Sequence, residues 1–190
     1  MARVRITVTS VTTTAVELVD GSGLEALTLS AVAKDLGVGP SALYTHCDGL
    51  DGLRGLVAVA ATDNLATNLR NAAIGYAGED ALLALGMAYR QFASDHPGQF
   101  AATIRPPDPA ADELANATQL LLDVFVLVFR AMGLDDERAA MAARSTRSAI
   151  HGFLAIEHLA AHGSSSAEFE HLLATLRAGL QRAEPTPEPG

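Results

Sequence analysis

Ser41, Tyr44, Thr45 and His46 bring two aliphatic hydroxyls, a phenol and an imidazole together within six consecutive positions. Groups of this kind donate and accept hydrogen bonds to phosphate oxygens and to the edges of DNA bases. The chain carries no nucleophile motif, phosphate-binding loop or carboxylate pair that would indicate an enzyme. By themselves these residues suit recognition of DNA and equally suit a helix–turn–helix that is packed for structure alone.

The elements that would present these side chains are two short helices joined by a tight turn over residues 28–46. Thr28 is placed to cap the first helix by accepting a hydrogen bond from a free amide of its first turn. Gly37 suits the left-handed residue that ends a helix, and Pro40 suits the first position of the next helix. Leu43 is predicted to face inward, so the polar residues lie outside, where a short helix can enter a DNA major groove. The buried face of the first helix is predicted from apolar residues at helical spacing: Leu29, Val32, Ala33 and Leu36.

A further helix is predicted before this pair. Thr7 is its expected N-cap, and the helix runs to about Asp20. Its buried face is predicted to consist of Val11, Ala15, Leu18 and Val19. Arg3 and Arg5 precede it and either touch the DNA backbone or minor groove, as basic arms can, or form a frayed end.

The first 55 residues, approximately, resemble the DNA-binding domain of the tetracycline-repressor (TetR) family. The matching pieces are Ala15 to Asp20, Gly23 to Thr28, Leu36-Gly37-Val38 and Pro40 to Tyr44. The resemblance implies a three-helix head that contacts DNA through Thr28, Gly39, Pro40, Ser41, Ala42, Tyr44, Thr45 and His46. Within this set, Thr28 and Tyr44 are expected to bind phosphate, while Ser41, Thr45 and His46 face base edges.

Two departures from the family and the charge of the head bear on DNA affinity. Cys47 stands where the family usually has an aromatic residue, and Leu50 stands where it has a phosphate-binding lysine. The chain has a net charge of −9, and residues 1–52 hold three basic against six acidic residues, a net charge of −3. Because neutralisation of phosphates supplies much of DNA affinity, we expect weak non-specific binding with a shallow salt dependence. Clustering of the basic residues on the DNA side, or a dimer that doubles each contact, would offset this charge.

Composition indicates a soluble globular chain, with 49% hydrophobic and 18% charged residues. The single cysteine, Cys47, excludes an internal disulfide, fits a reducing cytoplasm and is expected to be a buried filler rather than a redox sensor. We expect no signal peptide and no membrane span, since the longest apolar run, 120–129, contains Asp123 and is too short. These features predict a cytoplasmic protein.

From residue 49 onward the chain is predicted to be helical throughout. A helix over 49–72 connects the helix–turn–helix head, residues 1–52, to a second domain over 73–184, and a disordered tail is expected at 185–190. The helices of the second domain are expected over 79–95, 99–104, 110–132, 135–162 and 167–182, with a proline-rich loop at 105–109 and a Gly-Ser-Ser-Ser linker at 163–166. The predicted fold class is all-α, with a three-helix head and a C-terminal helical bundle that forms a dimer.

Several residues of the second half have two interpretations. His158 and His162 lie one helical turn apart, as a metal pair does or as histidines near a helix C-terminus do. No third ligand is evident, so no metal is predicted. Arg144, Arg147 and His151 share one helix face, which holds an anionic ligand or faces solvent. Aromatic and methionine residues at helical spacing belong either to the core or to the wall of a ligand pocket: Met87, Tyr89, Phe92, Phe100, Phe125, Phe129 and Met132.

The second half also resembles a TetR-type C-terminal domain, over about 79–182. Ile150-His151-Gly152-Phe153 is similar to its Trp-His-Gly signature with the tryptophan replaced, and His96-Pro97-Gly98 matches a second signature. The resemblance implies a small-molecule effector and a homodimer through residues 135–162 and 167–182. Gly152 costs about 1 kcal/mol relative to alanine inside a helix, which predicts close approach of another helix. The apolar faces that form the dimer, or else fill the monomer core, carry Ile150, Phe153, Leu154, Phe169, Leu172, Leu173, Leu176 and Leu180.

The sequence thus predicts a ligand-responsive transcriptional repressor that binds a palindromic double-stranded DNA operator as a homodimer, without cofactor or metal. The effector pocket is assigned to Phe92, Phe100, Phe125, Phe129, Arg147 and His151. The alternative is a helical dimer that binds a small molecule or a protein and has weakened DNA binding. An enzyme is a third, more distant interpretation, because no catalytic constellation is present.

Overall fold

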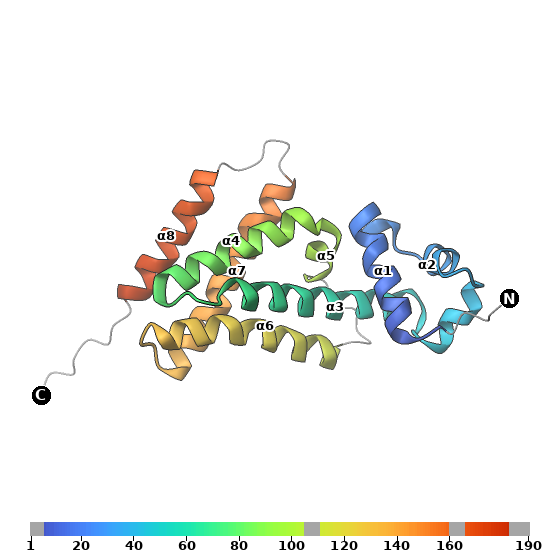
Figure 1. Cartoon of the computed structure of the whole chain (residues 1–190), viewed down its shortest axis with the longest axis horizontal. Helices are drawn as coiled ribbons and strands as arrows, with labels where there is room; N and C mark the ends of the chain where they lie inside the picture. The colour runs from blue at the N-terminus through green and yellow to red at the C-terminus, as the bar shows by residue number, and fades with distance from the viewer. Residues whose placement is uncertain (1–5, 105–110, 160–165, 183–190) are drawn as a thin grey trace, which may run out of the picture. The chain divides into compact units, whose positions relative to one another are not determined.

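Helices form every regular element in the computed structural model, which describes residues 6–104, 111–159 and 166–182. No strand occurs within these ranges, and the predicted all-α class is confirmed. In chain order (Figure 1) the elements are α1 (Val8–Ser22), the 3₁₀ helix η1 (Leu24–Ala26), α2 (Leu29–Asp35), the 3₁₀ helix η2 (Pro40–Thr45), α3 (Gly49–Ala72), α4 (Gly78–Asp95), α5 (Pro97–Ala102), α6 (Ala111–Ala131), α7 (Asp136–Leu159) and α8 (Ser166–Arg182).

The predicted helices are present, with small differences at their ends. The helix expected over 99–104 begins at Pro97 instead, because proline fits the first turn of a helix. The second helix of the helix–turn–helix pair is a 3₁₀ helix of six residues. Some predicted features lie outside the described residues: Arg3, Arg5, the loop at 105–109, His162, residues 163–165 of the linker and the tail at 185–190.

Local capping fixes the first two helices of the head as expected. Thr7 caps α1 by accepting from the Ser10 amide at 3.1 Å, while the Ser10 hydroxyl accepts from the Thr7 amide at 3.0 Å. Thr28 caps α2 by accepting from the Ala31 amide at 3.1 Å. Leu18, expected to be buried, is only partly so and packs at the edge of the head core. That core contains Val11, Ala15, Val19, Leu27, Val32, Ala33, Leu43, Cys47, Leu53, Val57, Ala61 and Ala102.

The chain forms two compact units that interleave along the sequence. The first comprises Met1–Asn68 and Gln91–Leu121, and the second comprises Leu69–Arg90 and Leu122–Gly190. The sequence predicts a single boundary at residue 73, with everything after it in the second domain. By contacts, α5 and the start of α6 group with the head instead. The helix–turn–helix is therefore part of a larger packed body.

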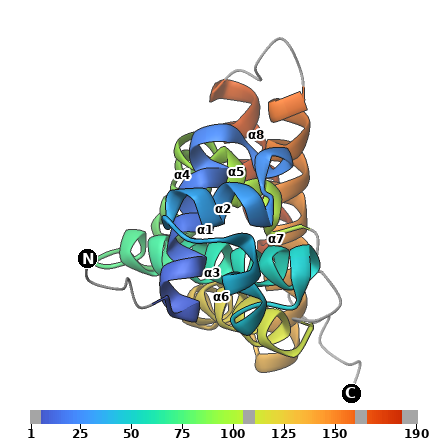
Figure 2. The ribbon, with the colours of Figure 1, turned by 90° about the vertical axis from the view of Figure 1, so that its right-hand side faces the viewer.

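Within the first unit, α5 lies against the end of α1, as Figures 1 and 2 show. The Asp20 carboxylate accepts from His96 Nδ1 at 2.8 Å, from the Gln99 amide at 3.2 Å and from Gln99 Nε2 at 2.6 Å. The Gln99 side-chain oxygen in turn accepts from Asn64 Nδ2 of α3 at 2.7 Å. One carboxylate thus joins α1 to α5, and Gln99 extends the network to α3.

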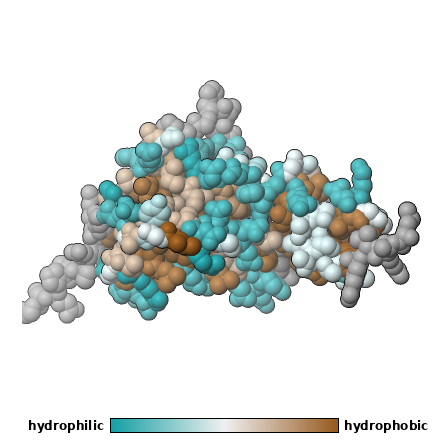
Figure 3. All heavy atoms as spheres, in the orientation of Figure 1, coloured by the Kyte–Doolittle hydropathy of each residue, from teal (hydrophilic) through white to brown (hydrophobic). Residues whose placement is uncertain are grey.

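The second unit packs around buried aromatic side chains of α4, α6 and α8. Its largest fully buried residues include Tyr89, Phe125, Phe129 and Phe169. Of the apolar residues predicted on the last two helices, Ile150, Leu154, Phe169 and Leu173 are buried in the core of this unit, whereas Phe153, Leu172, Leu176 and Leu180 stay half-exposed. Figure 3 shows apolar surface, in brown, interspersed among hydrophilic atoms over this part of the chain.

One helix, longer than the apolar run at 120–129, is long and apolar enough to cross a membrane by length and composition alone. The segment Asp112–Ala131 has a mean hydropathy of 1.5 over its most apolar stretch, and 39% of that stretch is buried inside the protein. The buried face of this helix carries Leu114, Ala117, Leu121, Phe125 and Phe129, which pack within the compact units. Core helices of soluble proteins pass the same test, so this apolar composition is weak evidence of a membrane span.

Candidate nucleic-acid interface

The predicted DNA-contact residues lie in and beside η2, apart from Thr28 at the start of α2, and most of them are exposed. Tyr44 has 62% of its surface accessible to solvent. Thr28, Gly39, Pro40, Ser41 and Thr45 are also exposed, while Ala42 and His46 are half-buried. Leu43, between them in sequence, is fully buried, as predicted. The same short segment therefore holds itself to the core and presents polar groups to solvent.

The geometry of the turn explains this presentation. Gly37 has a φ of +69°, a left-handed conformation that glycine adopts without a Cβ clash. The Val38 amide then donates to the Ala33 carbonyl at 2.9 Å, which closes the end of α2. Pro40 occupies the first turn of η2, where its missing N–H leaves no helix hydrogen bond unmade. These local features place η2 at the surface.

Two threonine hydroxyls of the set already make hydrogen bonds within the chain. Thr45 Oγ1 donates to the Ala42 carbonyl at 3.0 Å, so the hydroxyl oxygen is left to accept from an external donor. Thr28 Oγ1 accepts from the α2 amide, so its O–H stays available to donate to a phosphate oxygen. The two hydroxyls consequently suit different kinds of contact.

The residues after η2 pack the head instead of supplying positive charge. Cys47 is buried, and its Sγ lies 3.5 Å from the Leu43 carbonyl. Burial, with a smaller contribution from the neighbouring Asp48, raises the pKa of the Cys47 thiol, as expected for a buried filler. Leu50, at the position of the family's phosphate-binding lysine, is partly buried against the head core. Its apolar side chain adds packing at the expense of a phosphate contact.

A polar cluster in the second unit contains two of the residues predicted for the effector pocket. The Tyr89 hydroxyl and His151 Nδ1 share a hydrogen bond of 2.9 Å, and Arg147 interacts with both side chains. Burial, and then the Arg147 charge, lower the pKa of His151 to about 4, so the imidazole is neutral at physiological pH. Burial raises the pKa of Tyr89 to about 12, against a smaller opposing effect of Arg147. Arg144, predicted on the same face, is exposed to solvent.

The structure does not gather all six predicted pocket residues in one compact unit. Phe92 and Phe100 are buried in the first unit, whereas Phe125 and Phe129 are buried in the second with Arg147 and His151. Each unit contains a cavity of about 380 Å³, and neither cavity is lined by any of the six. The described residues also contain no group of three metal-binding side chains.

Sequence reasoning missed the groups that organise these clusters. Spacing predicts Tyr89 only as core or pocket wall, and Asp20 only as the end of the first helix and of a family motif. Arg90 pairs with Glu157 and lies 5.2 Å above the Phe169 ring, another link that spacing alone does not reveal. Two sequence signals did point to these places: the His-Pro-Gly signature at residues 96–98, and the assignment of Arg147 and His151 to the effector pocket.

The head contains a helix–turn–helix, and comparisons with known proteins define the class of protein to which the chain belongs. A family model described as "Tetracyclin repressor-like, C-terminal domain" matches residues 82–180. The chain is 34% identical over 171 residues to the HTH-type transcriptional regulator Rv0681 of Mycobacterium tuberculosis, covering 88% of this chain and 78% of that protein. It is 28% identical over 151 residues to the regulator YobS of Bacillus subtilis, covering 80% and 78% of the two chains.

Solved structures share the fold. The structure of Mycobacterium smegmatis BioQ matches with a TM-score of 0.73 and 23% identity, over 94% of this chain and 100% of that chain. BioQ bound to its natural double-stranded DNA operator matches with a TM-score of 0.71 and 22% identity, over 94% and 99%.

These findings define a DNA-binding transcriptional regulator of the helix–turn–helix class. The chain belongs to the TetR family, as the N-terminal motifs predict. Members of this family are transcription factors and not enzymes, in agreement with the expectation from the sequence. The Trp-His-Gly subtype of the C-terminal domain stays a prediction.

Proposed function

We propose that this protein is a cytoplasmic, ligand-responsive repressor that binds a palindromic operator as a homodimer. The observation that carries the proposal is the exposed polar surface of η2, held in place by the buried Leu43. A solved structure with the same fold, BioQ, is bound to its double-stranded DNA operator, which supports DNA as the partner.

The contact residues divide by chemistry. Thr28 and Tyr44 bind phosphates, because one retains a hydroxyl donor beside the start of α2 and the other extends a phenol from the surface. Ser41, Thr45 and His46 read base edges in the major groove. Gly39, Pro40 and Ala42 let the backbone of η2 approach the groove, because their side chains are small or absent.

Dimerisation is supported by one face of α7. Met141, Ser145, Ser148, Gly152 and Ile156 recur at helical spacing, and all five are exposed. Ile156 is 67% exposed, and a Cβ added at Gly152 would meet no atom within 4 Å. Small residues flanked by apolar ones suit the close packing of a partner helix, so a second copy fits this face, with α8 beside it. In this dimer, the helix that the sequence predicts close to Gly152 belongs to the partner subunit.

The effector site is centred on Arg147 and His151. The Arg147 Nε is buried and has no hydrogen-bond partner among the described residues. An anionic or hydrogen-bonding effector would satisfy this donor and, by favouring one spacing of the two heads over another, release the operator. Half-sites of a dimer lie about 34–36 Å apart, so a change in head spacing is sufficient.

The experiment that tests DNA recognition is selection of bound genomic fragments with the purified full-length protein at two salt concentrations. We expect one short palindrome, with a shallow loss of affinity at the higher salt because the head is acidic. Tyr44→Ala should weaken binding to all sequences, whereas His46→Ala should change which sequence is preferred. Tyr76→Ala is the matched control, since Tyr76 is 60% exposed but lies outside the head.

A second candidate function is a helical dimer that binds a small molecule or a protein and has weakened DNA binding. Leu50 packed into the head and the net charge of −3 over residues 1–52 favour it. A folded dimer that enriches no palindrome would support this candidate, and a Tyr44→Ala variant with unchanged operator affinity would contradict the contact roles.

A further inference from the structure

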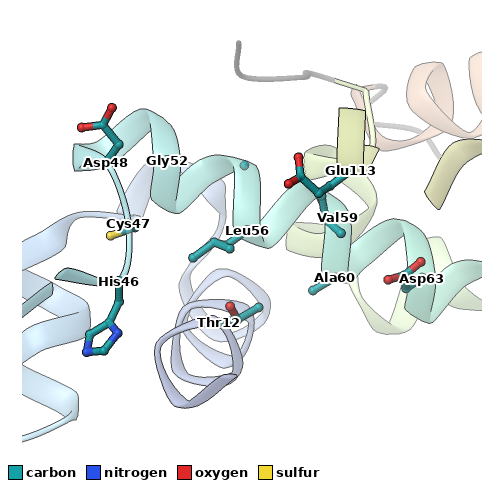
Figure 4. A pocket seen from close by; sticks show the side chains of 11 residues that line it. Thr12, His46, Cys47, Asp48, Gly52, Leu56, Val59, Ala60, Asp63 and Glu113 are labelled. Atoms are coloured by element: carbon teal, nitrogen blue, oxygen red, sulfur yellow. The ribbon is translucent and has the colours of Figure 1, made fainter. Parts of the chain in front are cut away.

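A cavity of about 380 Å³ lies within the first compact unit, beside the segment that joins η2 to α3 (Figure 4). It is lined by residues of α1, of this segment, of α3 and of α6, all inside one unit. The lining residues that the argument uses are Thr12, His46, Leu56, Val59, Asp63 and Glu113. The cavity is separate from the Tyr89–Arg147–His151 cluster, which belongs to the second unit.

The floor of the cavity is one apolar face of α3. Four lining residues lie on one side of this helix, because their spacings of four, three and one residues keep them within about a quarter of a turn to either side: Gly52, Leu56, Val59 and Ala60. Leu56 projects into the space between Thr12 and the α3 backbone in Figure 4. The volume falls within the range of about 300–1,000 Å³ that small-molecule sites occupy. An apolar body of the size of an aromatic ring with a short chain fits this floor.

The rim of the cavity is negatively charged. Asp48, Asp63 and Glu113 contribute carboxylates, and no lysine or arginine lines the space. All three are exposed, and within the described part of the chain none of their carboxylates makes an ion pair or a side-chain hydrogen bond. Burial and Asp48 both raise the pKa of the Cys47 thiol, so this lining residue stays uncharged. An anionic ligand would be repelled here, and a cationic one attracted.

We propose that this cavity binds a small organic cation, whose apolar body lies on the α3 floor and whose ammonium group lies beside Asp63 and Glu113, about 22 Å along α3 from Asp48. The apolar floor and the charged rim together select a ligand that has both an apolar part and a positive charge. A metal ion lacks the apolar part, and a neutral hydrocarbon lacks the charge. Because His46 lines the cavity and also belongs to the DNA-contact set, occupancy is coupled to operator affinity. This coupling rests on the proposed DNA-binding function, whereas cation binding itself does not.

The test uses three probes of the same shape on the DNA-free full-length protein: 4-phenylbutylammonium, 4-phenylbutanol and 4-phenylbutanoate. Binding is followed by the amide NMR shifts of the ¹⁵N-labelled chain. We expect the cation to bind saturably, with shifts centred on Thr12, Gly52 and Gly55, and with about fivefold higher affinity than the alcohol. The carboxylate should produce no saturable shift.

Paired variants separate the local charge from the overall charge. Asp63→Asn with Glu113→Gln should reduce the affinity of the cation to that of the alcohol while leaving the alcohol unchanged. The control, Glu17→Gln with Glu25→Gln, removes the same charge from exposed head positions that do not line the cavity and should leave cation affinity unchanged. Both pairs alter exposed residues, and the NMR spectrum itself reports whether each variant is folded.

The proposal is overturned if the cation and the alcohol bind equally, if the shifts centre elsewhere, if wild type does not bind the cation, or if both variant pairs weaken the cation equally. Operator affinity is measured separately with and without 4-phenylbutylammonium. If the cation binds but no operator is found, only the proposed DNA recognition is refuted. If an operator is bound but the cation does not bind, only this inference is refuted.

Discussion

Gly98 lies so close to Val19 that a Cβ added to the glycine would stand 1.9 Å from the Val19 carbonyl oxygen and 2.3 Å from its carbon. Both contacts are with backbone atoms, which cannot rotate away as the end of a side chain can. The start of α5 therefore rests on the last turns of α1 at a position that only glycine fits. This contact and the Asp20 hydrogen bonds together hold α5 to the helix–turn–helix head.

Gly98→Ala should destabilise the protein by about 3 kcal/mol or more, because the backbones of α1 and α5 must separate to admit the methyl group. Chemical denaturation of the purified variant measures the change in free energy of unfolding. Gly21→Ala is the control, since a Cβ there meets nothing within 4 Å, and it should stabilise α1 by up to about 1 kcal/mol. Equal stability of the two variants would show that the close approach is not maintained in solution.

Asp20→Ala should lower the free energy of unfolding by about 2–4 kcal/mol. The substitution removes the acceptor for His96 Nδ1, the Gln99 amide and Gln99 Nε2, and Gln99 is only 4% exposed. Asp35→Ala is the matched control, because Asp35 is an exposed aspartate on α2, and its loss should change stability by less than about 0.5 kcal/mol. A loss below that level for Asp20→Ala would mean that α5 is held by packing alone.

The His151 pKa predicts a dependence of stability on pH. Its folded-state value, about 4, lies below the ordinary value of 6.5, so the unfolded chain takes up a proton first as pH falls. The stabilisation is complete above pH 6.5 and is lost as pH falls through about 4. It amounts to about 2 kcal/mol once partial access of solvent to the side chain is allowed for.

Urea unfolding at pH 7.5, 5.5 and 4.5 measures this loss. His151→Gln should reduce the slope between pH 6.5 and 4.5, because glutamine can still hydrogen-bond the Tyr89 hydroxyl but does not titrate. A variant with the full wild-type slope would assign the acid sensitivity to other groups.

Gly152→Leu should convert the proposed dimer to monomers without unfolding the chain. Within one chain nothing lies within 4 Å of the new Cβ, and leucine favours a helix more than glycine does. In the dimer the larger side chain would meet the partner helix and weaken association about tenfold or more. Sedimentation velocity measures the oligomeric state, with Gly21→Leu in α1 as the control. A dimer that tolerates leucine at this position would move the interface away from this face of α7.

How far the sequence could go depends on the range of the interactions involved. The caps at Thr7 and Thr28, the left-handed Gly37, the proline that begins η2 and the inward Leu43 were all predicted, because each depends on neighbours within a few residues. The pattern also identified Tyr44 as exposed and Cys47 as buried. Capping hydrogen bonds and helical periodicity join residues that are close in the sequence, so the order of the residues is enough to predict them.

What only the tertiary structure decided are the pairings of distant segments. Asp20 and His96 are 76 residues apart, and Tyr89 and His151 are 62 apart, yet each pair shares a hydrogen bond. The packing also groups Phe92 and Phe100 with the first compact unit and Phe125 and Phe129 with the second, a division that helical spacing does not reveal. Helical spacing defines the face on which a residue lies but not the helix that covers this face. That choice depends on the packing of the whole chain, and here it placed α5 with the head and buried His151 beside Tyr89.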